Sequence, residues 1–194
     1  HNCSIMVDEA HSFGVLGDRG FGIRDHFGLG GDAVDIWMGT MSKALGSVGG
    51  FIAGGRDLIR GLRLSAPGIS MFTTGPAPST AAAALASLRI LKAEPERVHR
   101  LQENGRCFHR LANEYGFDTG TSQGTPIVPV ILHSTQRAAL ASTRMMAEGV
   151  NATAITYPSV PAGEERLRFF VTSEHTEDQM QTTLSTLRKV VDEL

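Results

Sequence analysis

The sequence predicts an α/β protein in two parts, and three features of its pattern support this fold class. Short, mostly apolar runs that end at glycine or polar residues recur in the first quarter of the chain, as in strands of a parallel sheet. An Ala-rich helical pattern follows from Ser79. Beyond Gly116, helical and strand-like patterns alternate. We expect residues 1–92 to supply part of a mostly parallel sheet with helices, and residues 93–194 to form a small α/β domain.

Three strands are predicted in the first part, over residues 3–7, 34–38 and 49–53. The first run is apolar except for Ser4, which is typical of a strand buried on both faces. Asp8 follows it directly. Because ligands of open α/β sheets bind outside the carboxyl ends of the strands, Asp8 is well placed to contact a cofactor.

The remaining elements follow from helical and strand periodicity. The Ala-rich helix should stop at Glu94-Pro95, and Pro95 can open a second helix that ends at Gly116. A capping box of Thr176 and Gln179 should begin the last helix. Between them we predict a strand at 127–132, a helix at 136–148 closed by Gly149, and strands at 150–155 and 167–171. The expected buried face of the last helix comprises Met180, Leu184, Leu187, Val191 and Leu194.

Composition narrows the class of protein. The chain has 194 residues, 41% of them hydrophobic, with net charge −2 and a pI near 6.4, and so lacks the basic surplus of a nucleic-acid-binding surface. No apolar stretch is long enough to span a membrane. Cys3 and Cys107 are far apart and suit neither a disulfide framework nor a metal site. We therefore expect a cytoplasmic protein without a bound metal.

Two segments together predict pyridoxal phosphate (PLP) chemistry. Asp8 and His11 lie in the first, and Thr40 and Lys43 in the second. An acid for a pyridine nitrogen, a His for the ring oxygen, a hydroxyl for a phosphate and a Lys for an imine are the groups that PLP requires. The sequence therefore predicts part of a PLP-dependent enzyme.

A competing interpretation starts from the same first segment. Residues 8–11, Asp-Glu-Ala-His, also spell the box with which helicases handle magnesium and water. Such an NTPase needs a Gly-rich phosphate loop upstream, and because only seven residues precede Asp8, its absence here does not decide between the two interpretations. The charge balance and the absence of a Ser-Ala-Thr segment favour the PLP interpretation, which also gives Lys43 a role.

Several motifs resemble the α-oxoamine synthase family. They are Val-Asp-Glu-Ala-His-Ser at residues 7–12, Asp-Ile-Trp-Met-Gly-Thr-Met-Ser-Lys at 35–43, Gly-Gly-Phe-Ile-Ala-Gly at 49–54, and Pro-Ser-Val-Pro-Ala-Gly at 158–163. The family consists of PLP enzymes of fold type I and includes serine palmitoyltransferase and 8-amino-7-oxononanoate synthase. The resemblance covers essentially the whole chain and implies that a first half, with a ring-stacking His, precedes it.

The resemblance assigns roles to three residues. Asp8 resembles the carboxylate that pairs with the pyridine nitrogen, and His11 the residue that hydrogen-bonds the ring oxygen. Lys43 resembles the lysine that forms the imine. The alternative roles are a turn aspartate, a structural histidine and a solvated surface lysine.

The hydroxyl residues Thr40, Thr73 and Thr74 have family counterparts as well. Thr40 resembles the hydroxyl that binds the cofactor phosphate, whereas Thr73 and Thr74 resemble residues that reach the phosphate of a neighbouring subunit. The resemblance thus implies a homodimer with shared active sites. Turn capping is the alternative role for all three, and the chain departs from the family pattern at residues 75–78, Gly-Pro-Ala-Pro.

Arg168 resembles the residue that binds the substrate carboxylate, for which a planar guanidinium is suited. Arg166 is the alternative, because side chains two residues apart on a strand share a face.

The resemblance implies a C-acyltransferase that condenses an amino acid with an acyl thioester, carried on CoA or an acyl carrier protein, generally with loss of carbon dioxide. Neither the amino acid nor the acyl chain can be read from the residues. The alternatives are an aminotransferase of the same fold type and a non-catalytic subunit, although such subunits typically lack the lysine. We expect the chain by itself to be inactive, with an exposed sheet edge.

Overall fold

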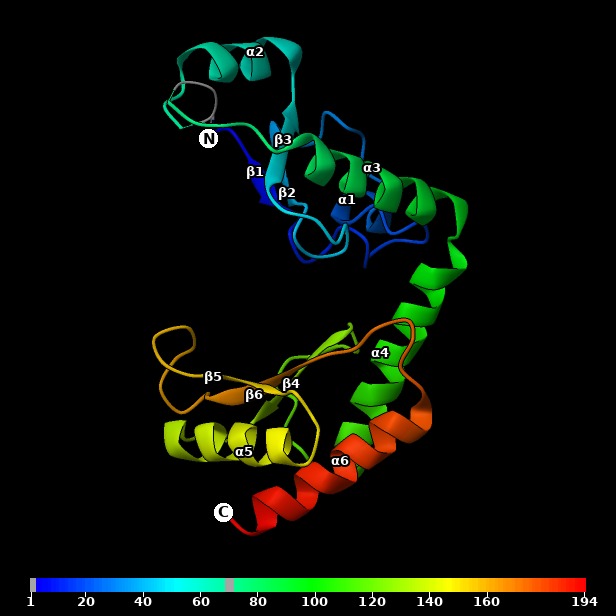
Figure 1. The fold of residues 1–194 in the computed structure, drawn as a ribbon, viewed down its shortest axis with the longest axis vertical. Coiled ribbons are helices and arrows are strands. Elements are labelled where there is room, and N and C mark those ends of the chain that lie inside the picture. The colour runs from blue at the N-terminus through cyan, green and yellow to red at the C-terminus, as the bar shows by residue number, and fades with distance from the viewer. Residues whose placement is uncertain (1–2, 69–71) are drawn as a thin grey trace. The chain divides into compact units, whose positions relative to one another are not determined.

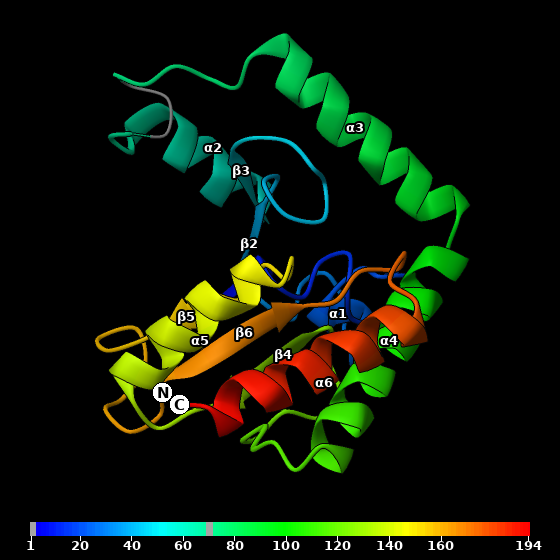
Figure 2. The same cartoon turned by 60° about the horizontal axis from the view of Figure 1, so that its bottom comes forward.

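The computed structural model describes residues 3–68 and 72–194, and the chain divides into two compact units, His1–His99 and Arg100–Leu194. Figures 1 and 2 show the elements of both units. The first unit contains a small sheet with three helices, and the second contains a sheet covered by helices.

The sheet of the first unit has the order β1-β2-β3. Strands β1 (Met6–Asp8) and β2 (Ile36–Thr40) are parallel, with Asp8 opposite Met38, whereas β3 (Gly50–Gly54) runs antiparallel to β2. All three strands lie within three residues of the predicted positions. The register aligns the carboxyl ends of β1 and β2, as the predicted cofactor site requires.

Residues 3–7 were expected to be buried on both faces, and this expectation is wrong for the structure described. Ile5 is 51% exposed and Met6 is 59% exposed. The reason is that β1 forms an edge of this sheet, so that within the described residues only β2 pairs with it. The apolar pattern of residues 3–7 is therefore typical of a buried strand, but the described residues leave this strand largely exposed.

Three helices belong mainly to the first unit: α1 (Ile23–His26), α2 (Arg56–Ser65) and α3 (Pro78–Ala93). The last of these is the predicted Ala-rich helix, begun by Pro78 in its first turn. The periodicity did not predict α1, because it has only four residues, or α2, because Gly61 interrupts its pattern.

The second unit is formed by α4 (Glu96–Glu114), β4 (Ile127–Ile131), α5 (Thr135–Ala147), β5 (Thr153–Ile155), β6 (Arg166–Phe170) and α6 (Glu177–Asp192). Its antiparallel sheet has the order β4-β6-β5. Figure 1 shows α5 on one side of this sheet, and alternate residues of β6 are buried. The capping box of Thr176 and Gln179 that begins α6 is confirmed.

A single apolar cluster forms the core of the second unit. It includes the predicted α6 residues Met180, Leu184, Leu187 and Val191, and Leu194 packs against it while partly exposed. Leu167 on β6 and Met145 on α5 are fully buried in the same cluster. No helix in the described residues has the length and hydrophobicity needed to cross a membrane.

Candidate functional site

The carboxyl ends of β1 and β2 bring two of the predicted site residues to one edge of the sheet. Asp8 ends β1, and the ladder continues one step further, because Glu9 N–H donates to Met38 O over 2.7 Å. Thr40, which ends β2, lies two residues beyond Met38. Asp8 Oδ1 accepts from Ala10 N at 2.7 Å, which turns the chain sharply after the strand.

The loop between β2 and β3 presents Lys43. Two backbone bonds close this loop, from Met41 N to Gly49 O and from Ser47 N to Met41 O, each 2.8 Å long. Lys43 is exposed between them, and within residues 3–68 and 72–194 its ammonium group forms no salt bridge or hydrogen bond that would occupy it. A lysine on a short closed loop has a restricted backbone and a side chain available for a ligand.

The Thr40 hydroxyl organises the start of this loop. Its Oγ1 donates to Gly49 O over 3.2 Å, accepts from Ser42 N at 3.2 Å, and lies 2.8 Å from Ser42 Oγ. Thr40 thus has the turn-capping role that was the alternative to phosphate binding, and it places a second hydroxyl, that of Ser42, beside it. An anion bound here would meet two hydroxyl donors only if Thr40 gave up its bond to Gly49.

His11 lies exposed in the turn that follows β1, and this turn contacts the loop of Lys43. Gly14 adopts a φ of +80°, and a side-chain carbon at this position would lie 2.3 Å from Ala44 Cβ. Only glycine allows both this backbone conformation and this close approach. The segments of Asp8 and His11 and of Thr40 and Lys43, distant in sequence, are therefore in contact.

Glu9 has a structural role that the sequence analysis did not predict. It is only 5% exposed, its carboxylate accepts from the Ser12 hydroxyl, and Ile23 N–H donates to both carboxylate oxygens at 3.0 and 3.1 Å. Its carboxylate therefore holds the turn after β1, which is incompatible with the role in handling magnesium that the helicase interpretation requires. Glu9 follows Asp8 at the end of a strand, and no local pattern in the sequence indicates that its carboxylate is buried.

Arg19 and Asp25 close the other end of the same turn. Asp25 Oδ2 accepts from Arg19 N at 2.8 Å, and its Oδ1 accepts from the guanidinium at 2.9 and 3.1 Å. Burial raises the pKa of Asp25, but the hydrogen bonds from Arg19, together with its charge and a backbone bond from Phe21, outweigh it and lower the pKa. The ionised form of Asp25 thus stabilises the turn of residues 19–25, which follows the segment of His11.

Thr73 and Thr74 are not brought into this arrangement. They are exposed in the irregular segment between residues 72 and 77, and neither forms a hydrogen bond with another residue of the described chain. Their assignment to a phosphate of a neighbouring subunit stays a prediction.

The two arginines of β6 share a face, as the alternation predicted, but they differ in their partners. Arg166 Nε donates to Glu164 O over 2.7 Å, and its Nη2 forms a 2.8 Å salt bridge with the Glu164 carboxylate. Arg168 stacks over the Phe170 ring at 4.9 Å, and its buried Nε has no hydrogen-bond partner in the described part of the chain. A buried N–H without an acceptor is costly, so Arg168 keeps a donor available for a ligand, whereas the Nε and Nη2 of Arg166 are engaged by Glu164. The assignment of Arg168 to the substrate carboxylate stays a prediction.

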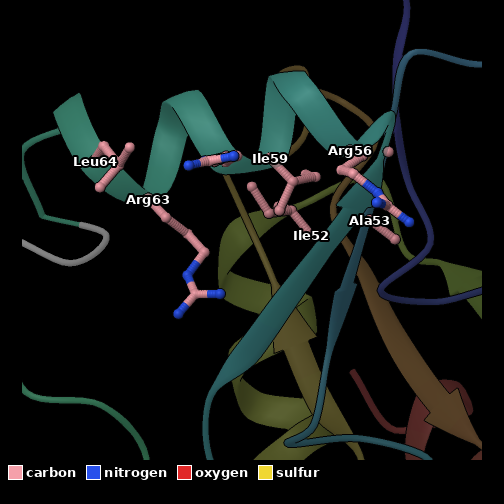
Figure 3. A pocket seen from close by; sticks show the side chains of 8 residues that line it. Ile52, Ala53, Arg56, Ile59, Arg63 and Leu64 are labelled. Carbon is pink, nitrogen blue, oxygen red and sulfur yellow. The ribbon is translucent and has the colours of Figure 1, made fainter.

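A basic hollow of about 740 Å³ lies elsewhere in the first unit, between β3 and α2. Figure 3 shows Arg56 and Arg63 of α2 on its rim with Ile52 and Ile59 between them. Since Gly54 pairs with Ile36 at the start of β2, this hollow opens at the end of the sheet opposite Thr40. Within residues 3–68 and 72–194 no group of His, Cys, Asp and Glu side chains is arranged to hold a metal ion.

Comparison with known proteins places this arrangement in context. Residues 1–187 match the protein family described as aminotransferase class I and II. The 8-amino-7-oxononanoate synthase of Symbiobacterium thermophilum is 45% identical over 194 residues, which are 100% of this chain and 49% of that protein. The 8-amino-7-oxononanoate synthase/2-amino-3-ketobutyrate coenzyme A ligase of Thermus thermophilus is 40% identical over 186 residues, which are 96% of this chain and 47% of that protein.

Among solved structures, a serine palmitoyltransferase from S. paucimobilis with bound PLP and myriocin matches 100% of this chain and 49% of its own, with a TM-score of 0.91 at 33% identity. The chain therefore spans about half the length of the relatives it matches. The structural match confirms the fold class that the sequence predicted.

Proposed function

Because the chain belongs to the aminotransferase class I and II family, we propose that it is the C-terminal portion of a PLP-dependent α-oxoamine synthase. The observation that carries this proposal is the contact between the turn of Asp8 and His11 and the loop of Thr40 and Lys43, at the carboxyl ends of adjacent parallel strands. The names of the two relatives described above, both of which include 8-amino-7-oxononanoate synthase, support it.

The residues present fit PLP by the chemistry of their donors. Asp8 Oδ2 and the Lys43 ammonium group form no hydrogen bond with described residues, while the Thr40 and Ser42 hydroxyls lie side by side. A carboxylate, an amine and paired hydroxyls match a pyridine nitrogen, an aldehyde and a phosphate. PLP, when bound, supplies an electron sink for the charge that develops at the substrate α-carbon.

In this proposal the chain's own residues hold and move protons. Asp8 keeps a proton on the ring nitrogen by its negative charge, and His11 donates to the ring oxygen. The Lys43 amine accepts the proton from the substrate α-carbon. The Thr40 hydroxyl would hold the phosphate in place of its bond to Gly49 O, and Arg168 would hold the amino-acid carboxylate.

The proposed reaction joins the amino-acid α-carbon to the acyl group of a thioester, carried on CoA or an acyl carrier protein, generally with loss of carbon dioxide. We further propose a cytoplasmic homodimer in which Thr73 and Thr74 reach the phosphate in the partner subunit's site. The free cysteines Cys3 and Cys107 support a reducing compartment. We place the end of the large PLP-binding domain at residue 92, next to the end of α3 at Ala93, with the small domain over 93–194.

The deciding experiment is an assay of the intact protein that carries this chain, with a panel of amino acids and of acyl thioesters on CoA and on acyl carrier protein. We expect an aminoketone product, free thiol and carbon dioxide. Transfer of the amino group to a 2-oxo acid without use of the thioester would contradict the synthase and establish the aminotransferase instead.

A further inference from the structure

The loop that joins β5 to β6, residues 156–165, is held in place by two hydrogen bonds to one of its glycines, Gly163. Figure 1 shows this loop projecting beyond the end of the sheet, and most of its residues are exposed, with Tyr157 at 69%. Both backbone groups of Gly163 are nevertheless engaged. Gly163 N donates to Glu165 Oε2 over 3.0 Å, and Gly163 O accepts from His133 Nδ1 at 2.8 Å.

Glu165 is the buried member of this network. Its residue is 5% exposed, and its Oε1 accepts from the Thr135 hydroxyl at 3.3 Å, at the first residue of α5. A buried carboxylate is retained only where donors surround it. Two donors bond to the Glu165 carboxylate, and one of them is the backbone N–H of Gly163 in the loop.

His133 is the exposed member, and its conformation is unusual. Its φ is +57°, a left-handed value that few residues other than glycine adopt. In this conformation Nδ1 reaches Gly163 O, while Nε2 lies 3.4 Å from Asp118 Oδ2. Because a carbonyl can only accept, Nδ1 carries the proton in this contact. Such backbone strain persists only where surrounding contacts hold it.

The position of the loop matters because it ends at the strand of the substrate arginine. Ile155 pairs with Arg166, so that the loop closes the end of the hairpin formed by β5 and β6. Arg168 follows two residues further along on the same face. The loop is therefore anchored two residues along β6 from the side chain that the proposed function assigns to the substrate carboxylate.

We propose that Glu165 and His133 are positioning residues, which fix the loop beside Arg168 through Gly163 and thereby set the affinity for the amino-acid substrate. The inference rests on the proposed function for its consequence, but the hold on the loop can be measured without any reaction. Neither residue contacts substrate. They act by fixing the position of the loop before the substrate binds.

The test compares His133→Gly with His133→Asn in the intact protein. Glycine removes the ring but accepts the left-handed backbone, so the fold should keep its stability. Asparagine also tolerates this conformation, and its amide can donate to Gly163 O. Glu148→Gln, an exposed carboxylate at the end of α5, serves as the control.

In His133→Gly the Gly163 amide keeps its bond to Glu165, but the loop loses the second of its two hydrogen bonds at Gly163. The opening that frees this amide should therefore cost less, and its hydrogen should exchange with deuterium about three- to tenfold faster, the factor expected from one net hydrogen bond. The amides of β4 and β6 should be unchanged. KM for the amino acid should rise by a similar factor while kcat changes less than about twofold. His133→Asn should recover most of both effects, and Glu148→Gln should show neither.

Unchanged exchange at Gly163 would overturn the proposed hold on the loop. Faster exchange with unchanged KM would overturn the positioning role, and faster exchange throughout β4 and β6 would mean that His133 supports the whole unit instead. If the protein shows no synthase activity, the exchange data still decide whether the network holds the loop, so that the two failures are distinguishable.

Discussion

The two units of this chain differ in what they bury. Arg100–Leu194 packs one continuous apolar cluster between its sheet and its helices, whereas the buried hydrophobic residues of the first unit, as far as the described residues show, are Val34, Leu45, Ala84 and Val98. Yet Asp8, His11, Thr40 and Lys43 all belong to the first unit. The unit with the proposed chemistry is held mainly by turns, hydrogen bonds and glycine contacts, and the unit with the core supplies Arg168.

The largest expected effect comes from separating the two units. We expect a polypeptide of residues 96–194 to unfold cooperatively in urea, because its apolar cluster is complete. A polypeptide of residues 1–95 should lack a cooperative unfolding transition, since its strands are exposed and β1 is an edge strand. Circular dichroism measures both. A cooperative urea transition of residues 1–95, with a circular dichroism signal like that of the folded protein, would contradict this expectation. Turnover by the 194-residue chain alone would contradict it as well.

Lys43→Ala should abolish turnover of the intact protein without lowering its stability, because Lys43 is exposed and its ammonium group forms no hydrogen bond or salt bridge with the described residues. Borohydride treatment of the unmodified protein with PLP should label Lys43, as peptide mapping will show. Arg56→Ala is a suitable control, since it also removes an exposed cation from the first unit. A label on another lysine would refute the assignment.

Leu184→Ala tests how much the apolar cluster stabilises the second unit. Leu184 is 0% exposed within the cluster, so its truncation should cost about 2–5 kcal/mol of unfolding free energy. Leu140→Ala on α5, where the side chain is 43% exposed, should cost less than about 0.5 kcal/mol. Urea titration of residues 96–194 measures both changes. Equal costs would mean that the cluster does not stabilise this unit.

Arg168→Lys tests the contribution of the second unit to the site. A lysine cannot reproduce two parallel hydrogen bonds to a carboxylate, so amino-acid binding should weaken by about 1.5–3 kcal/mol while thioester binding stays the same. Arg166→Lys should have a smaller effect, because Arg166 is engaged with Glu164. Separate KM values for the two substrates provide the measurement. An equal loss for both would indicate general damage to β6.

The smallest expected effect is a pH dependence confined to the first unit. The folded-state pKa of Asp25 lies below its ordinary value of 3.8, so Asp25 stabilises the turn above that pH and the contribution is lost as the pH falls through the lowered pKa. Trp37, the single tryptophan of the chain, donates to Gly31 O and reports on this region. Its fluorescence in acid should change at higher pH in Asp25→Asn than in the unmodified protein. Identical acid transitions would contradict the role of Asp25.

Sequence patterns were sufficient where one local rule decided the structure. The capping box of Thr176 and Gln179 and the stop at Gly116 follow from side-chain and backbone preferences within a few residues. The same holds for the order of Asp8, Thr40 and Lys43, because a strand end followed by a turn is visible in the sequence. These predictions needed no knowledge of distant contacts.

Long-range contacts determined what those patterns left open. The exposure of Ile5 and Met6 depends on which strands pair with β1, and the burial of Glu9 depends on Ile23, fourteen residues away. Alternation alone could not separate Arg166 from Arg168, since the difference lies in Glu164 and Phe170. The hydrogen bond from His133 to Gly163 joins residues thirty positions apart.

By itself, then, the sequence determined the α/β class, the positions of most elements and the residue types available for PLP chemistry, because periodicity, capping and turn preferences are local properties. Only the tertiary structure decided which carboxylates serve the fold, which arginine keeps an unpaired donor, and which glycine brings the two site segments into contact, since burial and hydrogen-bond partners are set by residues far apart in the chain.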